Sequence, residues 1–154
     1  MKHYEELVTE ALSRVKELMP WDLSRKLAAG EKPFLLDVRE PAEFAALRIH
    51  GAINVPRGIL EQSCEWDYDE TIPELVTGRD REIVVICRSG KRSVLAADMM
   101  LKMGFTNVIS LKTGMRGWSD YEQPMTNAKG EELTADDGDV LLASQVKLEQ
   151  RKPK

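Results

Sequence analysis

The sequence predicts a three-layer α/β protein, with helices on both faces of a mainly parallel sheet of about five strands. Two short apolar runs, residues 34–38 and 83–86, are continuous rather than alternating, as in parallel strands covered on both faces. Segments with helical spacing of apolar residues come before and after these runs. Strands that alternate with helices favour crossover connections and therefore a parallel sheet.

The composition places the chain among single-domain globular proteins. It has 154 residues, of which 42% are hydrophobic and 31% charged, whereas disordered chains are more polar. The longest uncharged stretch, residues 103–111, is far shorter than the ~20 apolar residues of a membrane span, so no membrane partner is expected. A net charge of −4 gives no reason to expect nucleic acid. Residues 1–19 carry charges throughout and lack the apolar block of a secretory signal, which predicts a cytoplasmic location.

Two helices are expected before the first strand. Apolar residues recur every three or four positions from Tyr4 to Met19, which predicts an amphipathic helix over residues 1–19 that ends at Pro20. Asp22 offers an N-cap side chain for a second, short helix, and Gly30 suits its C-terminus because glycine tolerates positive φ.

The remaining elements alternate between helix and strand. They are a helix over 41–47 with proline in its first turn, a strand over 52–55, a helix from after Cys87 to Met103 stopped by Gly104, a strand over 107–111 and a helix over 114–121. Beyond residue 125 the chain turns polar, with a weakly amphipathic stretch at 140–148 and a basic end. We therefore predict a catalytic domain over 20–125 with flanks 1–19 and 126–154, which either fold back onto the domain or bridge two chains as a homodimer.

The chemistry of the sequence is concentrated where the strand at 83–86 ends. Cys87 comes directly after this strand, and the polar loop that follows leads into a helix. Ligands bind at the carboxyl ends of parallel strands, and a loop that closes into a helix N-terminus directs backbone N–H groups inward, where they bind anions. These donors, with the positive charges of Arg88, Lys91 and Arg92, favour the nucleophilic thiolate form of Cys87. A free cysteine at the end of a core strand is more often a small buried hydrophobe, but burial alone does not explain the neighbouring basic residues.

Four ordered motifs in this chain resemble those of the rhodanese-like domains, a sulfurtransferase family, and the resemblance covers about residues 21–124. The motifs are Asp37-Val38-Arg39 followed by Glu43-Phe44, residues 49–56, the loop Cys87 to Ser93, and residues 114–118 followed by Pro124. The chain departs from the family at Leu47-Arg48, where glycine-histidine is usual, at His50 in place of proline, and at Thr113 in place of a frequent glycine. These departures lie outside the loop that carries the chemistry.

The resemblance implies sulfur transfer through a Cys87 persulfide. In related cysteine phosphatases the arginine falls six residues after the cysteine, whereas Arg92 falls five after Cys87, and this tighter loop is the form associated with sulfur transfer. The expected donor is thiosulfate, and the expected acceptor is cyanide, a small thiol or a partner protein. No metal or organic cofactor is expected. The substrate-binding residues are predicted to be Arg88, Ser89, Gly90, Lys91, Arg92, Ser93 and, bordering the pocket after the second motif, Arg57.

Two other functions remain open at this stage. The domain could serve as a persulfide relay or binding module for a partner protein, or less plausibly act as a cysteine phosphatase or arsenate reductase. Arg57 could equally be a solvated loop charge.

Other polar residues have structural interpretations. Asp37 and Arg39 are expected to tie the strand to a neighbouring loop, and His3 and His50 have no metal-ligand spacing. Cys64 could resolve the persulfide as a disulfide, but its acidic neighbours indicate an incidental thiol.

Overall fold

The computed structural model describes all residues 1–154, and its centre is a parallel sheet of five strands in the order β1-β5-β4-β2-β3. The strands are β1 (Lys16–Leu18), β2 (Phe34–Asp37), β3 (Ile53–Asn54), β4 (Ile83–Ile86) and β5 (Val108–Leu111). A separate antiparallel hairpin joins β6 (Met125–Thr126) to β7 (Glu132–Leu133). Every residue of β2 and β4 is buried, so the prediction of an α/β fold with covered parallel strands is confirmed.

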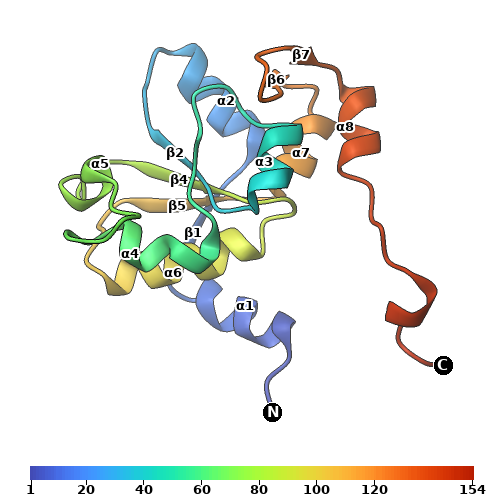
Figure 1. Cartoon of the computed structure of the whole chain (residues 1–154), viewed down its shortest axis with the longest axis horizontal. Helices are drawn as coiled ribbons and strands as arrows, with labels where there is room; N and C mark the ends of the chain where they lie inside the picture. The colour runs from blue at the N-terminus through green and yellow to red at the C-terminus, as the bar shows by residue number, and fades with distance from the viewer.

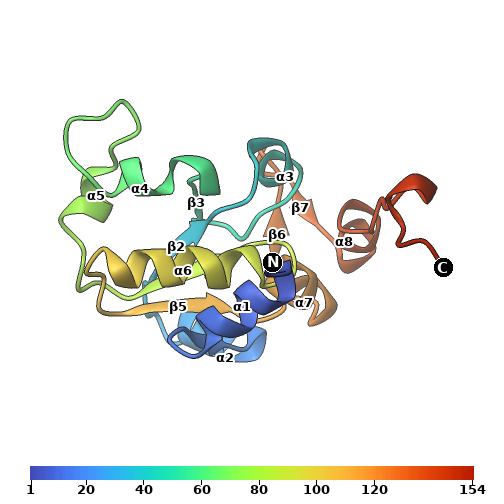
Figure 2. The ribbon, with the colours of Figure 1, turned by 90° about the horizontal axis from the view of Figure 1, so that it is seen from below.

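Helices cover both faces of the sheet and produce three layers. They are α1 (Tyr4–Leu12), α2 (Pro20–Ala28), α3 (Pro41–Ala46), α4 (Leu60–Ser63), α5 (Pro73–Val76), α6 (Arg92–Lys102), α7 (Gly114–Asp120) and α8 (Ala135–Leu141), with short 3₁₀ turns η1 (Arg57–Ile59) and η2 (Leu148–Gln150). Helices α1, α4 and α6 lie on one side of the sheet, and α2 and α7 on the other (Figures 1 and 2). No helix is long and apolar enough to cross a membrane.

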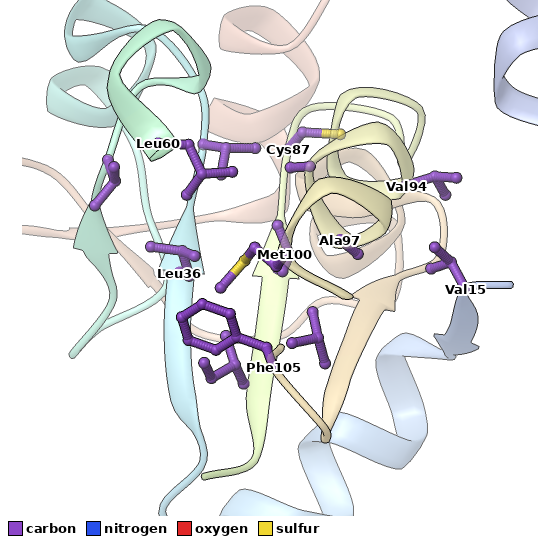
Figure 3. Packing of buried hydrophobic residues seen from close by; sticks show 14 of the residues in the cluster. Val15, Leu36, Leu60, Cys87, Val94, Ala97, Met100 and Phe105 are labelled. Atoms are coloured by element: carbon purple, nitrogen blue, oxygen red, sulfur yellow. The ribbon is translucent and has the colours of Figure 1, made fainter. Parts of the chain in front are cut away.

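Each face of the sheet has its own hydrophobic core. Leu36 of β2 lies on the face of the sheet that carries Met100 of α6 and Phe105 (Figure 3), and Val85 of β4 belongs to the same buried cluster. On the other face, alternate residues of the same strands meet Trp118 of α7. The loop that begins with Cys87 follows β4, the middle strand of the sheet, so its starting point is held by neighbouring strands on both sides.

The prediction of one helix over residues 1–19 is wrong. Helix α1 ends at Leu12, the chain turns, and β1 pairs with the outer edge of β5. Pro20 does not end the first helix but occupies the first turn of α2, where its missing N–H costs nothing. The apolar residues Val15 and Leu18 fit either the apolar stripe of a helix or a strand. The strand forms because it pairs with β5, whose edge backbone N–H and C=O groups would stay unpaired if residues 16–18 continued the helix.

The C-terminal flank contains a helix, α8, that the sequence pattern did not predict. Most of it precedes the weakly amphipathic stretch at 140–148, and it begins where it does because Thr134 caps it through its hydroxyl and the Asp137 carboxylate accepts from the Thr134 N–H. Leu142 is buried in the core, and the chain beyond it runs away from the sheet (Figure 1). Both flanks therefore contact the domain within one chain, while the predicted boundaries at 19 and 125 and the homodimer remain predictions.

Candidate active site

Cys87 is the first residue after β4, and α6 begins at Arg92. Cys87 is 1% exposed, so the thiol lies at the bottom of the loop rather than on the surface. The loop turns at Gly90, whose φ of +94° suits glycine, and a Cβ there would lie 2.9 Å from the backbone nitrogen of Thr113. The short polar loop predicted between strand and helix is present, and it is tight because a neighbouring loop presses against it.

The sulfur of Cys87 is surrounded by hydrogen-bonding groups. The backbone N–H of Gly90 donates to Cys87 Sγ over 3.1 Å, and Ser93 Oγ lies 3.3 Å from the same sulfur. Ser93 Oγ is in turn 2.8 Å from Ser110 Oγ of β5, and both serines are buried. Hydroxyl hydrogens rotate, so the Ser93 hydroxyl can accept a hydrogen bond from the thiol or donate one to the thiolate. Ser110 was not among the predicted site residues, and its only signal in the sequence is that it is a polar residue in an otherwise apolar strand.

A second loop fixes the start of the first. The N–H of Met115 donates to the Cys87 carbonyl over 2.8 Å, and the N–H of Arg116 donates to the Arg88 carbonyl over 2.9 Å. A Cβ on Gly114 would lie 2.4 Å from the Cys87 carbonyl oxygen, so only glycine permits this approach. Thr113, which replaces the frequent glycine, adopts a left-handed φ of 65°. This motif therefore holds the backbone of Cys87 and Arg88 in place.

The three basic side chains of the loop each have a partner elsewhere. Arg92 donates from both terminal nitrogens to the carboxylate of Glu43 on α3, at 2.8 Å each. Lys91 forms an ion pair with Glu5 of α1. Arg88 donates to the carbonyl of Leu142 at the end of α8, with the shorter contact at 2.6 Å. None of these side chains bonds to Cys87, so the direct contacts of the sulfur are a backbone amide and a hydroxyl.

The ion pairs at the rim shift the titration of their members. Hydrogen bonding to Arg92 lowers the pKa of Glu43, and the carboxylate in return raises the pKa of Arg92. Glu5 likewise raises the pKa of Lys91. Burial raises the pKa of Tyr4, and the charge of Cys87 adds to this effect, which places the phenol within electrostatic reach of the sulfur. These shifts keep the Glu43 carboxylate and both cations charged at neutral pH.

Asp37 and Arg39 form a fully buried ion pair at 2.8 Å, in agreement with their predicted structural role. Arg39 also donates to the carbonyls of Leu47, at 2.7 Å, and Glu43, at 3.3 Å, at the end and in the middle of α3. The Asn54 amide donates to the carbonyls of both Asp37 and Arg39. This network holds α3 in the orientation that brings Glu43 to Arg92.

Arg57 lies just after β3, at the edge of the sheet where the carboxyl ends of the parallel strands and the Cys87 loop are found. Its guanidinium pairs with Glu61 at 2.8 Å rather than with a residue of the loop. Its role beside the pocket remains a prediction.

His50 lines two cavities, of about 560 and 290 Å³, and neither cavity is lined by a residue of the Cys87 loop. No group of three or more His, Cys, Asp or Glu side chains is arranged to hold a metal ion.

Cys64 is fully buried, and it is a free thiol like Cys87. Burial raises the pKa of Cys64 to about 11, a stronger effect than that of its acidic neighbours Glu65 and Glu61, while Arg79 acts in the opposite direction. From the sequence Glu65 and Asp67 are expected to act on Cys64; the structure retains Glu65, has Glu61 in place of Asp67, and makes burial the dominant cause. The interpretation of Cys64 as an incidental thiol fits this environment.

A parallel α/β sheet with a cysteine loop at the carboxyl end of its central strand defines a class of cysteine-dependent proteins with an anion cradle. Within this class the chain matches the model of the rhodanese-like domain over residues 20–121, and it belongs to this family.

Several known proteins are similar to this chain. A protein named "Sulfurtransferase" from Allochromatium vinosum is 31% identical over 116 residues, covering 75% of this chain and 99% of that protein. The "Putative sulfur carrier protein YrkF" of Bacillus subtilis is 34% identical over 111 residues, 72% of this chain, and the match spans only 55% of its length. A solved structure from Rhodopseudomonas palustris, described as a protein of unknown function and possible tyrosine phosphatase, is 25% identical with a TM-score of 0.72, covering 86% of this chain and 96% of that one.

Proposed function

We propose that this protein is a sulfurtransferase in which Cys87 carries the transferred sulfur as a persulfide, with thiosulfate as a donor. The observation that carries the proposal is the position of Cys87 Sγ, which accepts a hydrogen bond from the Gly90 N–H inside a closed six-residue loop. A backbone amide of this kind stabilises negative charge on sulfur without any reorganisation. Family membership and relatives named as sulfurtransferases and a sulfur carrier support the same chemistry.

The reaction follows a double displacement. The Cys87 thiolate attacks the outer sulfur of thiosulfate, a new S–S bond forms, and the bond to the sulfonate sulfur breaks with its electron pair leaving on sulfite. The terminal sulfur of the persulfide takes over the negative charge, which the loop amides stabilise. Cyanide or a thiolate then attacks this terminal sulfur, and the thiolate of Cys87 is released. The proposal needs no metal or cofactor because each step only exchanges bonds to sulfur.

The side chains around the loop support this chemistry in two ways. Arg88 keeps its full charge beside a neutral carbonyl, whereas Lys91 and Arg92 are paired with carboxylates, so the rim keeps a net positive charge that favours the approach of an anionic donor and the departure of sulfite. The Ser93 hydroxyl, 3.3 Å from the sulfur, donates to the thiolate once the thiol has lost its proton. Ser89 and Gly90 contribute backbone only.

The direct test is to incubate the protein with thiosulfate and to measure the intact mass. We expect a gain of one sulfur atom that is lost on addition of cyanide, with thiocyanate as the product. Cys87→Ser should gain no mass, whereas the matched variant Cys64→Ser should gain as much as the wild type. A sulfur adduct on Cys87→Ser, or none on the wild type with any sulfane donor, contradicts the proposal.

A persulfide relay that serves a partner protein is a second form of the same chemistry. The similarity to a sulfur carrier favours it. Transfer from a protein persulfide should then be far faster than transfer from thiosulfate, measured by the same mass gain on Cys87. Equal rates from both donors would favour the enzyme that uses small molecules.

A cysteine phosphatase is the competing function, and the description of the solved structural neighbour raises it. Phosphatase chemistry needs an arginine that binds phosphate oxygens in a bidentate manner, and here both terminal nitrogens of Arg92 are occupied by Glu43. We therefore expect no hydrolysis of an aryl phosphate under conditions in which thiosulfate labels Cys87. Hydrolysis that is lost in Cys87→Ser would overturn the assignment.

A further inference from the structure

The first turn of α1 reaches the rim of the active-site loop, although it precedes residue 20, where the matched domain begins. The carboxylate of Glu5 forms an ion pair with the ammonium group of Lys91. The same ammonium lies 6.0 Å from the centroid of the Tyr4 ring, within the range of a cation–π contact. Two successive residues of α1 thus contact one cation of the loop.

Helix α1 is anchored to the domain, so this contact is part of the fold. Val8 and Ala11 are buried in the core beside α6. Just after the helix, Arg14 binds the carboxylate of Asp98 on α6 through two hydrogen bonds of 2.7 and 2.9 Å. Figure 2 shows α1 lying beside α6, with the N-terminus directed toward the end of α6 at which the loop is located. The position of Glu5 therefore follows from tertiary packing.

The pairing changes the charge that a donor meets. Of the three loop cations, Arg92 is neutralised by Glu43, and Arg88 is bound to a neutral carbonyl and keeps its full charge. Lys91 is neutralised by Glu5. A cavity of about 320 Å³ separates α1 from the loop and is lined by both members of this pair together with Ser89 and Gly90. The carboxylate thus borders open space beside the loop.

We propose that Glu5 is a positioning residue that sets the charge selectivity of the site. By pairing with Lys91 it weakens the attraction of the rim for anions, and so reduces the advantage of a dianionic donor such as thiosulfate over a singly charged donor such as benzenethiosulfonate. The inference rests on the proposed function. The two donors react alike: the thiolate of Cys87 forms a bond to the outer sulfur, and the electron pair of the broken S–S bond leaves on sulfite or on benzenesulfinate. The two donors therefore undergo the same reaction step and differ in that step by one unit of negative charge.

The charge-neutral substitution Glu5→Gln tests this directly. The side chains of Glu5 and Lys91 are 68% and 42% exposed, and an exposed pair contributes little to stability, so the variant folds. At low ionic strength we expect kcat/KM to rise about twofold with benzenethiosulfonate and about fourfold with thiosulfate, because the electrostatic effect scales with donor charge. Both increases should shrink at high salt. Lys91→Gln should lower kcat/KM with both donors, and Glu5→Asp should restore the wild-type ratio of kcat/KM for thiosulfate to kcat/KM for benzenethiosulfonate.

The matched control is Glu10→Gln, which removes the same charge from the same helix at a residue that pairs with Lys2. This variant should leave the ratio of the kcat/KM values for the two donors unchanged. The inference is wrong if Glu5→Gln raises kcat/KM by the same factor with both donors or leaves both values unchanged. It is also wrong if Glu10→Gln has the same effect as Glu5→Gln.

Alkylation of Cys87 separates this inference from the proposed function, because it requires no sulfur donor. The ratio of the rates with iodoacetate, an anion, and iodoacetamide, its neutral analogue, reports the local potential and cancels changes in thiol reactivity. We expect this ratio to rise about twofold in Glu5→Gln. An unchanged ratio overturns the role of Glu5 whatever the donor. If the ratio of alkylation rates rises in Glu5→Gln but no sulfane donor labels the protein, the electrostatic role of Glu5 is supported. Only the proposed sulfur transfer is then contradicted.

Discussion

The two cysteines of this protein make a natural comparison, because both are buried, both are free thiols, and both belong to the same hydrophobic cluster. Cys64 ends a short helix and is enclosed by packing, so burial raises its pKa to about 11. Cys87 ends a strand and is enclosed by hydrogen-bonding groups, namely the Gly90 N–H and the Ser93 hydroxyl. Equal burial thus produces two different environments.

The difference teaches that exposure alone does not identify a nucleophile. An inert buried thiol is surrounded by atoms that cannot stabilise charge, whereas a thiol in a cradle of donors loses little when it leaves bulk water. The contrast depends on the loop around Cys87 more than on the cysteine itself. Substitutions that damage the loop should therefore make Cys87 behave like Cys64.

The largest effect is expected from Gly114→Ala. The added Cβ would lie 2.4 Å from the Cys87 carbonyl oxygen, at a φ of +57°, so the loop must move. A displacement of this kind should reduce persulfide formation at least about a hundredfold and lower the free energy of unfolding by about 2–4 kcal/mol. Stopped-flow rates and urea unfolding measure the two effects.

The matched control is Gly51→Ala, at a φ of +85° with no atom within 4 Å of the added Cβ. It should cost about 1 kcal/mol through backbone strain and leave the rate of persulfide formation unchanged. A normal rate in Gly114→Ala would show that the clamp on the Cys87 carbonyl does not shape the cradle.

A smaller effect is expected from Ser93→Ala. Loss of the hydroxyl 3.3 Å from Cys87 Sγ should slow persulfide formation about tenfold, the value of one hydrogen bond to a charged group. It should also cost about 1–3 kcal/mol of stability, because the buried Ser110 hydroxyl loses its partner. The control Ser63→Ala removes another buried hydroxyl, bonded to the Ile59 carbonyl, and should reduce stability alone. Equal rates in both variants would contradict the role of Ser93.

The smallest effect concerns Cys64 and appears only in the pH dependence of stability. The unfolded thiol loses its proton near its ordinary pKa of 9.0, whereas the folded thiol keeps it up to about pH 11. Unfolding is therefore favoured as the pH rises between these values, and the stability linked to the buried neutral thiol is present below pH 9. The difference in unfolding free energy between wild type and Cys64→Ala should shrink as the pH rises from 8 to 10.5. A difference that stays constant would place the thiol in contact with water.

The parts of the fold that the sequence predicts correctly are those with strong local signals. The run Ile83–Ile86 is apolar throughout, and Phe34–Asp37 is apolar up to its last residue; both strands are buried along their whole length, as expected for parallel strands covered on both faces. Residues 13–19 were assigned wrongly because their pattern fits helix or strand, and a non-local partner, β5, decides between the two. A local pattern contains no information about an unpaired edge elsewhere in the chain.

The candidate site divides in the same way. Its loop was predicted because Cys87, Gly90 and the basic residues are adjacent in sequence. The contacts that complete it come from distant positions: Ser110 on β5, the Leu142 carbonyl at the end of α8, and Glu5 on α1. Glu43 was part of a recognised motif, but its partner Arg92 was evident only in the structure.

By itself the sequence determined the class of fold, the family resemblance and the choice of Cys87 as the candidate nucleophile, because each depends on residues that are neighbours along the chain. Only the tertiary structure decided which groups meet the sulfur, which carboxylates pair with Lys91 and Arg92, and why the pKa of Cys64 is raised. Those properties arise from burial and from contacts between segments up to 86 residues apart, as between Glu5 and Lys91. Packing of the layers brings such segments together, and it depends on the whole chain at once.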